Sequence, residues 1–224
     1  GIYFKNRRQL HFKGYGAFLK LNNSANVWVW KVDSSYDIRI EGFYIDGNMN
    51  NQTSNGGIVI ENTTGFYIND VNLQNIRTHA LGLYGVHRGI VSDFTAVDGH
   101  SSETGRGIDI DEGTGGDNES SDITISGAHI EGFYSGALKL ENSWNIGAFD
   151  CVFKGIASDA TGQNVIVIGN NDAGADTSEQ FLFDGNLIEG GNQIFIDKCS
   201  GEVVFQNNII RDTYFAWEDD LQKL

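Results

Sequence analysis

The sequence predicts an all-β chain folded as a parallel β-helix, a solenoid of about eight coils of short strands. Two observations indicate this fold class. The composition combines 29 glycines and 22 asparagines with no proline, which is typical of many short strands joined by tight turns. One pattern also recurs along the chain: a short alternating apolar run, two turn residues and a second short run, at a minimum spacing of 22 to 23 residues.

The recurring pattern defines one strand of each coil. Seven apolar residues occupy equivalent positions in successive copies, separated by 28, 23, 34, 23, 35 and 22 residues. They are Ile40, Ile68, Val91, Ile125, Ala148, Phe183 and Phe205. The copies alternate with a period of two and lack helical periodicity. Because a unit of this size cannot bury its apolar face alone, we expect neighbouring copies to stack with parallel strands.

A second alternating strand is expected between successive copies. Its positions are 58–60, 81–83, 108–110, 138–140, 166–168 and 194–196. The longer spacings predict Gly-, Ser-, Asn-, Thr- or Asp-rich loops at 47–57, 100–105, 113–121, 157–163 and 170–178. Asparagines after several strands predict a ladder of stacked amides, formed by Asn22, Asn62, Asn142 and Asn170. We expect one β-helix domain over residues 1–217 without an N-terminal cap, followed by a polar tail or cap at 218–224.

Composition limits the function classes. Thirty acidic residues against 15 basic ones give a formal charge of −15, which disfavours nucleic acid and anionic membranes as partners. The longest apolar runs are far below the roughly 20 residues of a membrane span, and no signal peptide opens the chain. Two cysteines, Cys151 and Cys199, are too few for a disulfide framework. Stability must therefore come from the apolar core.

Stacking converts equivalent positions into rows of side chains about 4.8 Å apart. Two outward rows follow from the second strands. The first comprises Val59, Gly82, Asp109, Lys139, Val167 and Phe195, and the second Glu61, Tyr84, Asp111, Glu141, Gly169 and Asp197. Acids, a lysine and a tyrosine therefore converge near the middle of the solenoid. Arg106 and His79 occupy equivalent positions at the start of two of these strands.

Paired carboxylates are what glycosidic cleavage needs, one as acid and one as base or nucleophile. Asp109 and Asp111 are two residues apart on one strand, so roughly 6.6 Å between their Cα atoms is expected. We consider Asp109, Asp111, Glu141, Lys139 and Arg106 as candidate catalytic residues. Tyr84, His79 and Glu61 are the candidate substrate-binding residues. The alternative is an ordinary surface, in which Asp109 pairs with Lys139 and the other acids solvate the face.

The segments 10–17 (LHFKGYGA) and 40–48 (IEGFYIDGN) resemble early coils of the pectin-lyase-like superfamily of right-handed parallel β-helices. That superfamily includes pectate lyases, polygalacturonases and phage tailspike depolymerases. The resemblance implies a right-handed β-helix over nearly the whole chain. The short capping helix that usually precedes the first coil in that superfamily is absent.

The segment 106–111 (RGIDID) partly resembles the polygalacturonase signature Asn-Thr-Asp-Gly-Ile-Asp, but Thr104, Gly105 and Arg106 replace its first three residues. The first catalytic aspartate of that family is therefore missing. A pectate-lyase mechanism would need carboxylates that bind calcium beside an Arg or Lys base, and the candidate catalytic residues are of these types. The oxygen-rich loop 111–119 is a second candidate for Ca²⁺, with a solvated acidic loop as its alternative. We expect no required cofactor, with Ca²⁺ as a possible ligand.

Two functions remain open. The first is an extracellular, cell-surface or virion-associated carbohydrate-active β-helix that binds or cleaves a polysaccharide, as a glycoside hydrolase or polysaccharide lyase would. The second is a non-enzymatic structural or adhesive solenoid, such as a fibre, filament or tailspike subunit, that forms homo-oligomers or end-to-end assemblies. Neither involves nucleic acid or a membrane.

Overall fold

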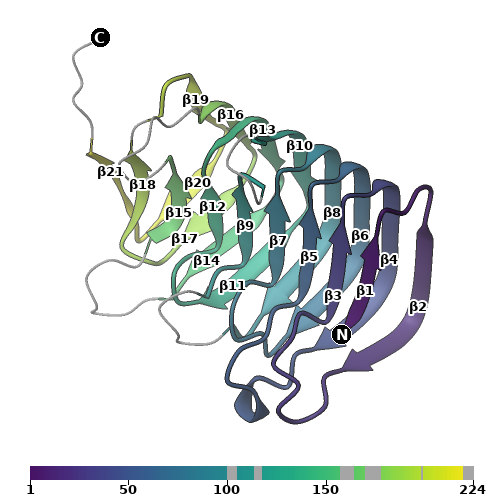
Figure 1. Cartoon of the computed structure of the whole chain (residues 1–224). Helices are drawn as coiled ribbons and strands as arrows, with labels where there is room; N and C mark the ends of the chain where they lie inside the picture. The colour runs from purple at the N-terminus through teal and green to yellow at the C-terminus, as the bar shows by residue number, and fades with distance from the viewer. Residues whose placement is uncertain (100–104, 114–117, 157–163, 170–177, 198, 219–224) are drawn as a thin grey trace.

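The protein is an all-β solenoid in which every strand pairs in parallel with strands of the neighbouring coils (Figure 1). The computed structural model describes residues 1–99, 105–113, 118–156, 164–169, 178–197 and 199–218. The predicted tail at 218–224 lies outside these residues except for Glu218, which ends the last strand. In the described residues there is no helix long and apolar enough to cross a membrane.

Sheet A runs along one side of the solenoid and contains the strands predicted between the repeats. Its nine strands, in spatial order, are β1 (Ile2–Lys5), β3 (Trp30–Asp33), β5 (Ile58–Glu61), β7 (Leu81–Tyr84), β9 (Ile108–Asp111), β12 (Leu138–Leu140), β15 (Asn164–Ile168), β18 (Gln193–Asp197) and β21 (Tyr214–Glu218). Figure 1 shows these strands side by side at the front of the molecule.

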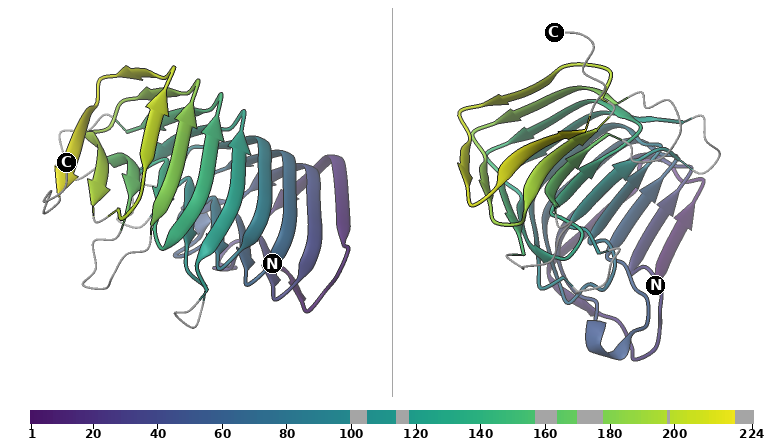
Figure 2. Two further views of the ribbon diagram at one scale, coloured as in Figure 1. Left: turned by 90° about the horizontal axis from the view of Figure 1, so that it is seen from above. Right: turned by 90° about the vertical axis from the view of Figure 1, so that its left-hand side faces the viewer.

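Sheet B forms the rest of the wall and bends once in every coil. In the first coils the bent strand is continuous, as β2 (His11–Lys20), β4 (Tyr36–Asp46), β6 (Thr64–Gln74) and β8 (His87–Val97). In later coils it is divided into two parts: β10 (Ser120–Ser126) and β11 (His129–Phe133), β13 (Ser143–Phe149) and β14 (Val152–Gly155), β16 (Glu179–Asp184) and β17 (Leu187–Glu189), and β19 (Val203–Gln206) and β20 (Ile209–Arg211). A short 3₁₀ helix, η1 (Met49–Asn51), lies in the first predicted loop. Figure 2 shows the coils end on.

The bend of sheet B explains the repeat in the sequence. The seven equivalent apolar residues pair with one another from coil to coil, as in Ile40 with Ile68 and Phe183 with Phe205. Two residues after each one, the backbone adopts a left-handed conformation with φ between 48° and 74°. These residues are Gly42, Asp70, Asp93, Gly127, Asp150, Gly185 and Asn207. Glycine, Asn and Asp tolerate this conformation best, so the turn chemistry of the repeat fixes the bend.

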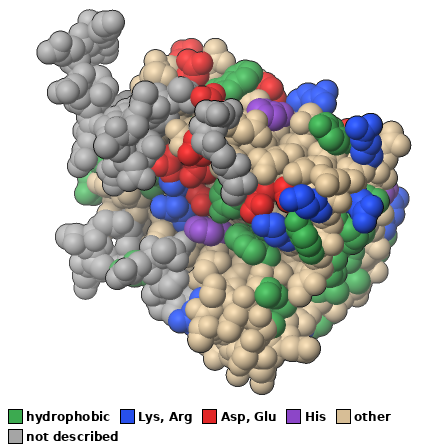
Figure 3. Space-filling model, in the orientation of Figure 1, with side chains coloured by type: hydrophobic (Ala, Val, Ile, Leu, Met, Phe, Trp, Pro, Cys, Tyr) green, Lys and Arg blue, Asp and Glu red, His purple; other side chains and the backbone are tan. Residues whose placement is uncertain are grey.

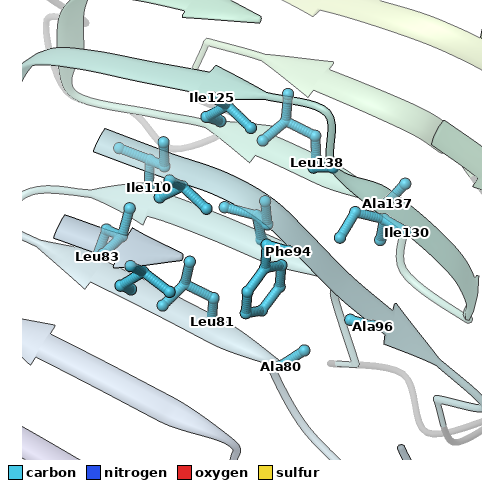
Figure 4. Close-up of a cluster of buried hydrophobic side chains, with 14 of the residues drawn as sticks. Ala80, Leu81, Leu83, Phe94, Ala96, Ile110, Ile125, Ile130, Ala137 and Leu138 are labelled. Carbon is cyan, nitrogen blue, oxygen red and sulfur yellow. The ribbon is translucent and has the colours of Figure 1, made fainter. Parts of the chain in front are cut away.

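The inward-facing side chains of both sheets form one apolar core along the axis. Figure 4 shows part of it, where Leu81, Leu83 and Ile110 from sheet A meet Phe94 and Ile125 from sheet B. All five side chains are fully buried. Removing one of them would cost about 2–5 kcal/mol, because the stacked neighbours cannot collapse into the space.

The predicted amide ladder does not form among its described members, and a different one forms at another corner. Asn62 and Asn142 are left-handed, but Gly85 and Glu112 occupy this corner on the coils between them, so their amides do not stack on each other. Asn22 is exposed, and Asn170 lies outside the described residues. The ladder observed runs through Asn186: its amide oxygen accepts from the Cys151 backbone N–H (2.9 Å), and its backbone N–H donates to Asn208 Oδ1 (2.8 Å).

Of the predicted loops, 47–57 is described in full and 113–121 in part. The loop at 157–163 lies outside the described residues, as do 170–177 and 100–104 of the other two. Cys151 is buried and Cys199 is partly buried.

Candidate functional site

The outer face of sheet A carries three parallel rows of side chains. The strand register places Asp109 beside Gly82 and Lys139, and Asp111 beside Tyr84, as the alternation predicts. A third row precedes the strands, because backbone hydrogen bonds align Gly56, His79 and Arg106 on successive coils. Figure 3 shows acidic, basic and histidine side chains gathered in the middle of this face.

Asp109 is the centre of this group. The Tyr84 hydroxyl donates to Asp109 Oδ2 at 3.1 Å, and Arg106 Nη1 lies 3.4 Å from Oδ1. His79 Nε2 lies 3.8 Å from Oδ2. Although Asp109 is on an outward row, it is only 5% exposed. Its carboxyl group is therefore surrounded by three side chains rather than by water.

Lys139 holds the two other carboxylates. Its Nζ lies 3.5 Å from Asp111 Oδ2 and also bonds to Glu141 Oε2. Asp111 Oδ1 accepts from Asn142 Nδ2 at 3.2 Å and from the Glu112 backbone N–H at 2.7 Å. We refer to these residues as the Asp109 cluster: His79, Tyr84, Arg106, Asp109, Asp111, Lys139 and Glu141. Lys139 therefore pairs with Asp111 and Glu141 rather than with Asp109, and the acids are not simply solvated.

Two glycines make room for the aromatic rings of this face. A Cβ on Gly82 would lie 2.8 Å from the Tyr84 ring and hydroxyl, so the ring lies over Gly82 on its way to Asp109. A Cβ on Gly56 would lie 2.1 Å from the Trp28 ring. Trp28 stacks on His79 with 6.3 Å between ring centroids and 19° between planes. An aromatic surface thus borders the charged group.

Burial sets the protonation states of the cluster. It raises the pKa of Asp111 above the usual 3.8, and Lys139 and the Glu112 N–H only partly offset this effect. Burial also lowers the pKa of His79 below 6.5, against the attraction of Asp109. The pKa of Tyr84 is raised, first by burial and then by the negative charge of Asp109. At neutral pH the cluster thus contains a neutral imidazole, a phenol that keeps its proton, and a carboxyl that is more easily protonated than usual.

Two buried nitrogens of the cluster have no hydrogen-bond partner in the described part of the chain: His79 Nδ1 and Arg106 Nε. Leaving a buried donor or acceptor unsatisfied costs about 1–3 kcal/mol. Such atoms also occur elsewhere in the described residues, as at Trp30 Nε1 and Ser143 Oγ, so they do not by themselves mark a ligand site.

The carboxylates of the cluster do not fit a calcium site. Calcium takes six to eight oxygen ligands, many of them from unpaired carboxylates. Here Asp109 bonds to Arg106 and Tyr84, while Asp111 and Glu141 bond to Lys139. In the described residues no group of three or more His, Cys, Asp or Glu side chains could hold a metal ion. The second calcium candidate, loop 111–119, lies partly outside those residues.

The structure brings together seven of the eight candidate residues. Glu61 is the exception, because it pairs with Lys31 at 2.8 Å on the other side of Tyr84. Two residues that we did not consider as part of the site also contribute: Trp28 covers His79, and Asn142 donates to Asp111. The position of Trp28 could have been predicted from the sequence, because this outward aromatic residue is aligned with a glycine, Gly56, on the next coil. The role of Asn142 was hidden by its suitability for a turn.

No family model and no curated protein matches the chain. Several solved structures resemble it at low sequence identity. The enzymatically active domain of Bacteriophage CBA120 tailspike protein 2 is 13% identical, with 97% of this chain and 39% of that chain covered and a TM-score of 0.62. An alginate lyase from Paenibacillus sp. str. FPU-7 is 14% identical, with 96% and 89% covered and a TM-score of 0.62.

The Streptococcus pneumoniae surface protein and adhesin PfbA is 9% identical, with 96% and 68% covered and a TM-score of 0.62. The chain spans about half (52%) of the length of the Geobacillus virus E2 ORF18 protein, which it also matches. At such identities the likeness concerns the fold. Together with the parallel sheets wound around one axis, it shows that the chain is a right-handed parallel β-helix of the pectin-lyase-like fold.

Proposed function

We propose that the chain is a carbohydrate-active β-helix, extracellular or on a virion, that cleaves a polysaccharide at the Asp109 cluster. One observation carries the proposal. Seven ionisable side chains from three successive coils are packed together and largely buried on the outer face of sheet A. A surface with only a structural role has no reason to bear the cost of this burial.

Asp111 and Asp109 supply the two roles that glycosidic cleavage requires. Asp111 has a raised pKa and would protonate the oxygen of the leaving sugar as general acid. Asp109 pairs with Arg106, accepts a hydrogen bond from Tyr84, and would act on the sugar from the same strand, as base toward water or as nucleophile. The two carboxyl groups thus lie in different environments, as separate acid and base roles require.

The other residues position the substrate. The Trp28 and Tyr84 rings offer flat apolar surfaces on which a sugar ring can stack. The partly exposed guanidinium of Arg106 can donate hydrogen bonds to sugar hydroxyls. Lys139 fixes Asp111 and Glu141 in place. The tailspike domain and the alginate lyase share the fold, which supports a polysaccharide as partner.

The proposal is tested by incubating the protein with a panel of neutral and acidic polysaccharides and measuring new reducing ends. We expect Asp109→Asn and Asp111→Asn to lower the rate by about 100-fold or more, since each removes one group of an acid–base pair. Asp70→Asn is a matched control, because Asp70 is an exposed left-handed corner residue on sheet B.

Unsaturated sugar ends among the products would indicate elimination rather than hydrolysis and would overturn the acid–base roles given above. Full activity in both Asp→Asn variants would exclude the Asp109 cluster as the catalytic site. No turnover on any polysaccharide would favour the alternative function, an adhesive or structural solenoid, which the likeness to a surface adhesin also supports.

A further inference from the structure

A second groove lies on the outer face of sheet B, away from the Asp109 cluster. Its volume is about 740 Å³, and strands β2, β4, β6 and β8 form its floor. Its lining includes His11, Arg39, Tyr67, Arg88 and Ile90. We refer to it as the sheet B groove.

Two carboxylates, Asp37 and Glu41, also line this groove, but neither is paired with its arginines, unlike the carboxylates of the Asp109 cluster. Neither Arg39 nor Arg88 has an ion-pair partner within the described part of the chain, and both are exposed. The nearby Glu41 is already bonded to His11, with 2.5 Å between Oε2 and Nε2. Arg39 lies over the Tyr67 ring, 5.7 Å from its centroid, which orders the guanidinium and leaves its edge donors available.

The charge distribution of the chain supports an anionic ligand here. Residues 1–41, which provide seven of the 12 residues that line the groove, contain seven Lys and Arg against three Asp and Glu. The remaining 183 residues contain eight against 27. The first coils are thus the basic end of an otherwise acidic protein and offer local electrostatic attraction that the rest of the surface lacks.

The face continues toward later coils as a more neutral groove. Ile90 is paired in register with Thr124, which lines a further hollow of about 320 Å³ together with Asn145, Gln180 and Leu182. Amide and hydroxyl groups beside an apolar side chain suit sugar hydroxyls and ring faces. The same hollow contains Asp122, whose Oδ1 accepts from Asn145 Nδ2 at 2.6 Å. Its charge would repel any anionic group bound beside it, so an acidic group of a ligand belongs at the arginine end of the face.

We propose that the outer face of sheet B binds a linear acidic saccharide along the solenoid axis, with a carboxylate or sulfate of the sugar held by Arg39 and Arg88. Arginine forms paired hydrogen bonds with such oxyanions. The two Cα atoms are two strands and two residues apart, roughly 12 Å, so both side chains can reach one bound oligosaccharide. This binding site is separate from the catalytic function proposed above and does not depend on it.

The test is calorimetric titration of Asp109→Asn protein, which suppresses cleavage, with three probes. These are an oligosaccharide of hexuronic acid, a sulfated oligosaccharide and a neutral glucose oligosaccharide of equal length. In the same background, Arg39→Gln with Arg88→Gln should weaken the affinity for at least one acidic probe by about tenfold or more, since each charged hydrogen bond is lost. The better acidic probe identifies the oxyanion. Arg211→Gln, an exposed arginine on β20, is the control and should change the affinity less than twofold.

The double variant should lose affinity for the acidic probes alone, and this loss of affinity should be smaller at high salt. Unchanged affinity in the double variant, or equal affinity for the neutral probe, would overturn the proposal. The proposal would also be overturned if light scattering showed that the double variant changes its oligomeric state while its saccharide binding is unchanged. The face would then join copies of the chain. Cleavage by protein with Asp109 intact should be the same with and without the arginines, so failure here leaves the catalytic proposal standing.

Discussion

The outer faces of the two sheets differ in whether their charged side chains are paired. On sheet A, Asp109, Asp111 and Glu141 each have a cationic neighbour, and the group is largely buried. On sheet B, Arg39 and Arg88 face an open groove without carboxylate partners in the described residues. The first arrangement fixes geometry and protonation, as chemistry requires. The second leaves charge available for a ligand, as binding requires.

The largest expected difference between the faces is in stability. Asp109→Ala leaves Arg106 and Tyr84 without their buried acceptor, so the free energy of unfolding should fall by about 3 kcal/mol. Arg39→Ala removes an exposed side chain that stacks on Tyr67 and should cost less than about 1 kcal/mol. Urea-induced unfolding of both variants measures this difference. Equal losses would mean that the Asp109 cluster is not an energetically coupled unit.

Gly82→Ala should produce the next largest effect. The new Cβ would displace the Tyr84 ring and break its hydrogen bond to Asp109, at a cost of about 1–1.5 kcal/mol, and activity should fall with it. In an alkaline titration followed by tyrosinate absorbance, one additional tyrosine should then ionise near pH 10.

Gly147→Ala is the matched control on sheet B. A Cβ there lies 2.5 Å from the Phe149 ring, so it also displaces an aromatic ring. The ring of Phe149 makes no hydrogen bond and lies away from the Asp109 cluster, so activity should be unchanged. If the two variants lost equal activity, ring displacement itself would be responsible, rather than the contact between Tyr84 and Asp109.

His79 should make a moderate contribution to the pH dependence of stability. Burial lowers its pKa below 6.5, against the attraction of Asp109, while Arg106 and Lys139 add to the lowering. The unfolded chain therefore binds more protons just below pH 6.5, and stability should fall as the pH drops through this window. In His79→Gln the fall between pH 7.5 and 5.5 should be smaller. Chemical denaturation at the two pH values measures it, and an identical fall would assign the pH dependence to other groups.

The smallest expected effect concerns salt. The ion pairs of the Asp109 cluster are shielded from solvent, so raising the salt concentration to about 1 M should change stability by less than about 0.5 kcal/mol through this region. Saccharide binding by Arg39 and Arg88 should weaken over the same range, because both side chains are exposed. If the stability of the wild type and of Asp109→Ala depends on salt to a similar extent, the ion pairs of the Asp109 cluster are shielded as expected. A markedly smaller salt dependence of stability in the variant would contradict this expectation.

The sequence was most informative where structure depends on backbone periodicity. The coil repeat, the strands of sheet A and the rows that contain Asp109 and Asp111 are all confirmed, because a strand has a strict period of two and parallel stacking preserves it. The turn residues predicted the positions of the bends correctly, but they did not predict the position of the asparagine ladder. Asn suits a left-handed corner at many positions, whereas a ladder also needs Asn on adjacent coils, as at Asn186 and Asn208.

Side-chain contacts were less predictable. The pairing of Lys139 with Asp111 and Glu141, and of Glu61 with Lys31, depends on rotamers that the alternation does not specify. Burial of the acids depends on neighbouring side chains from other coils, so an exposed acidic row was the natural expectation. The sheet B groove had a signal, since the excess of Lys and Arg in residues 1–41 is visible in the sequence. Only the coil register places Arg39 near Arg88.

The central claim is that the face around Asp109 binds and cleaves a polysaccharide. Its most direct test is a crystal structure of the Asp109→Asn protein with an oligosaccharide of the polysaccharide that the wild type degrades. We predict a sugar ring against Trp28 and Tyr84, with a glycosidic oxygen within hydrogen-bond distance of Asp111. A second protein copy packed over this face in solution and in the crystal, with no sugar bound there, would contradict the claim.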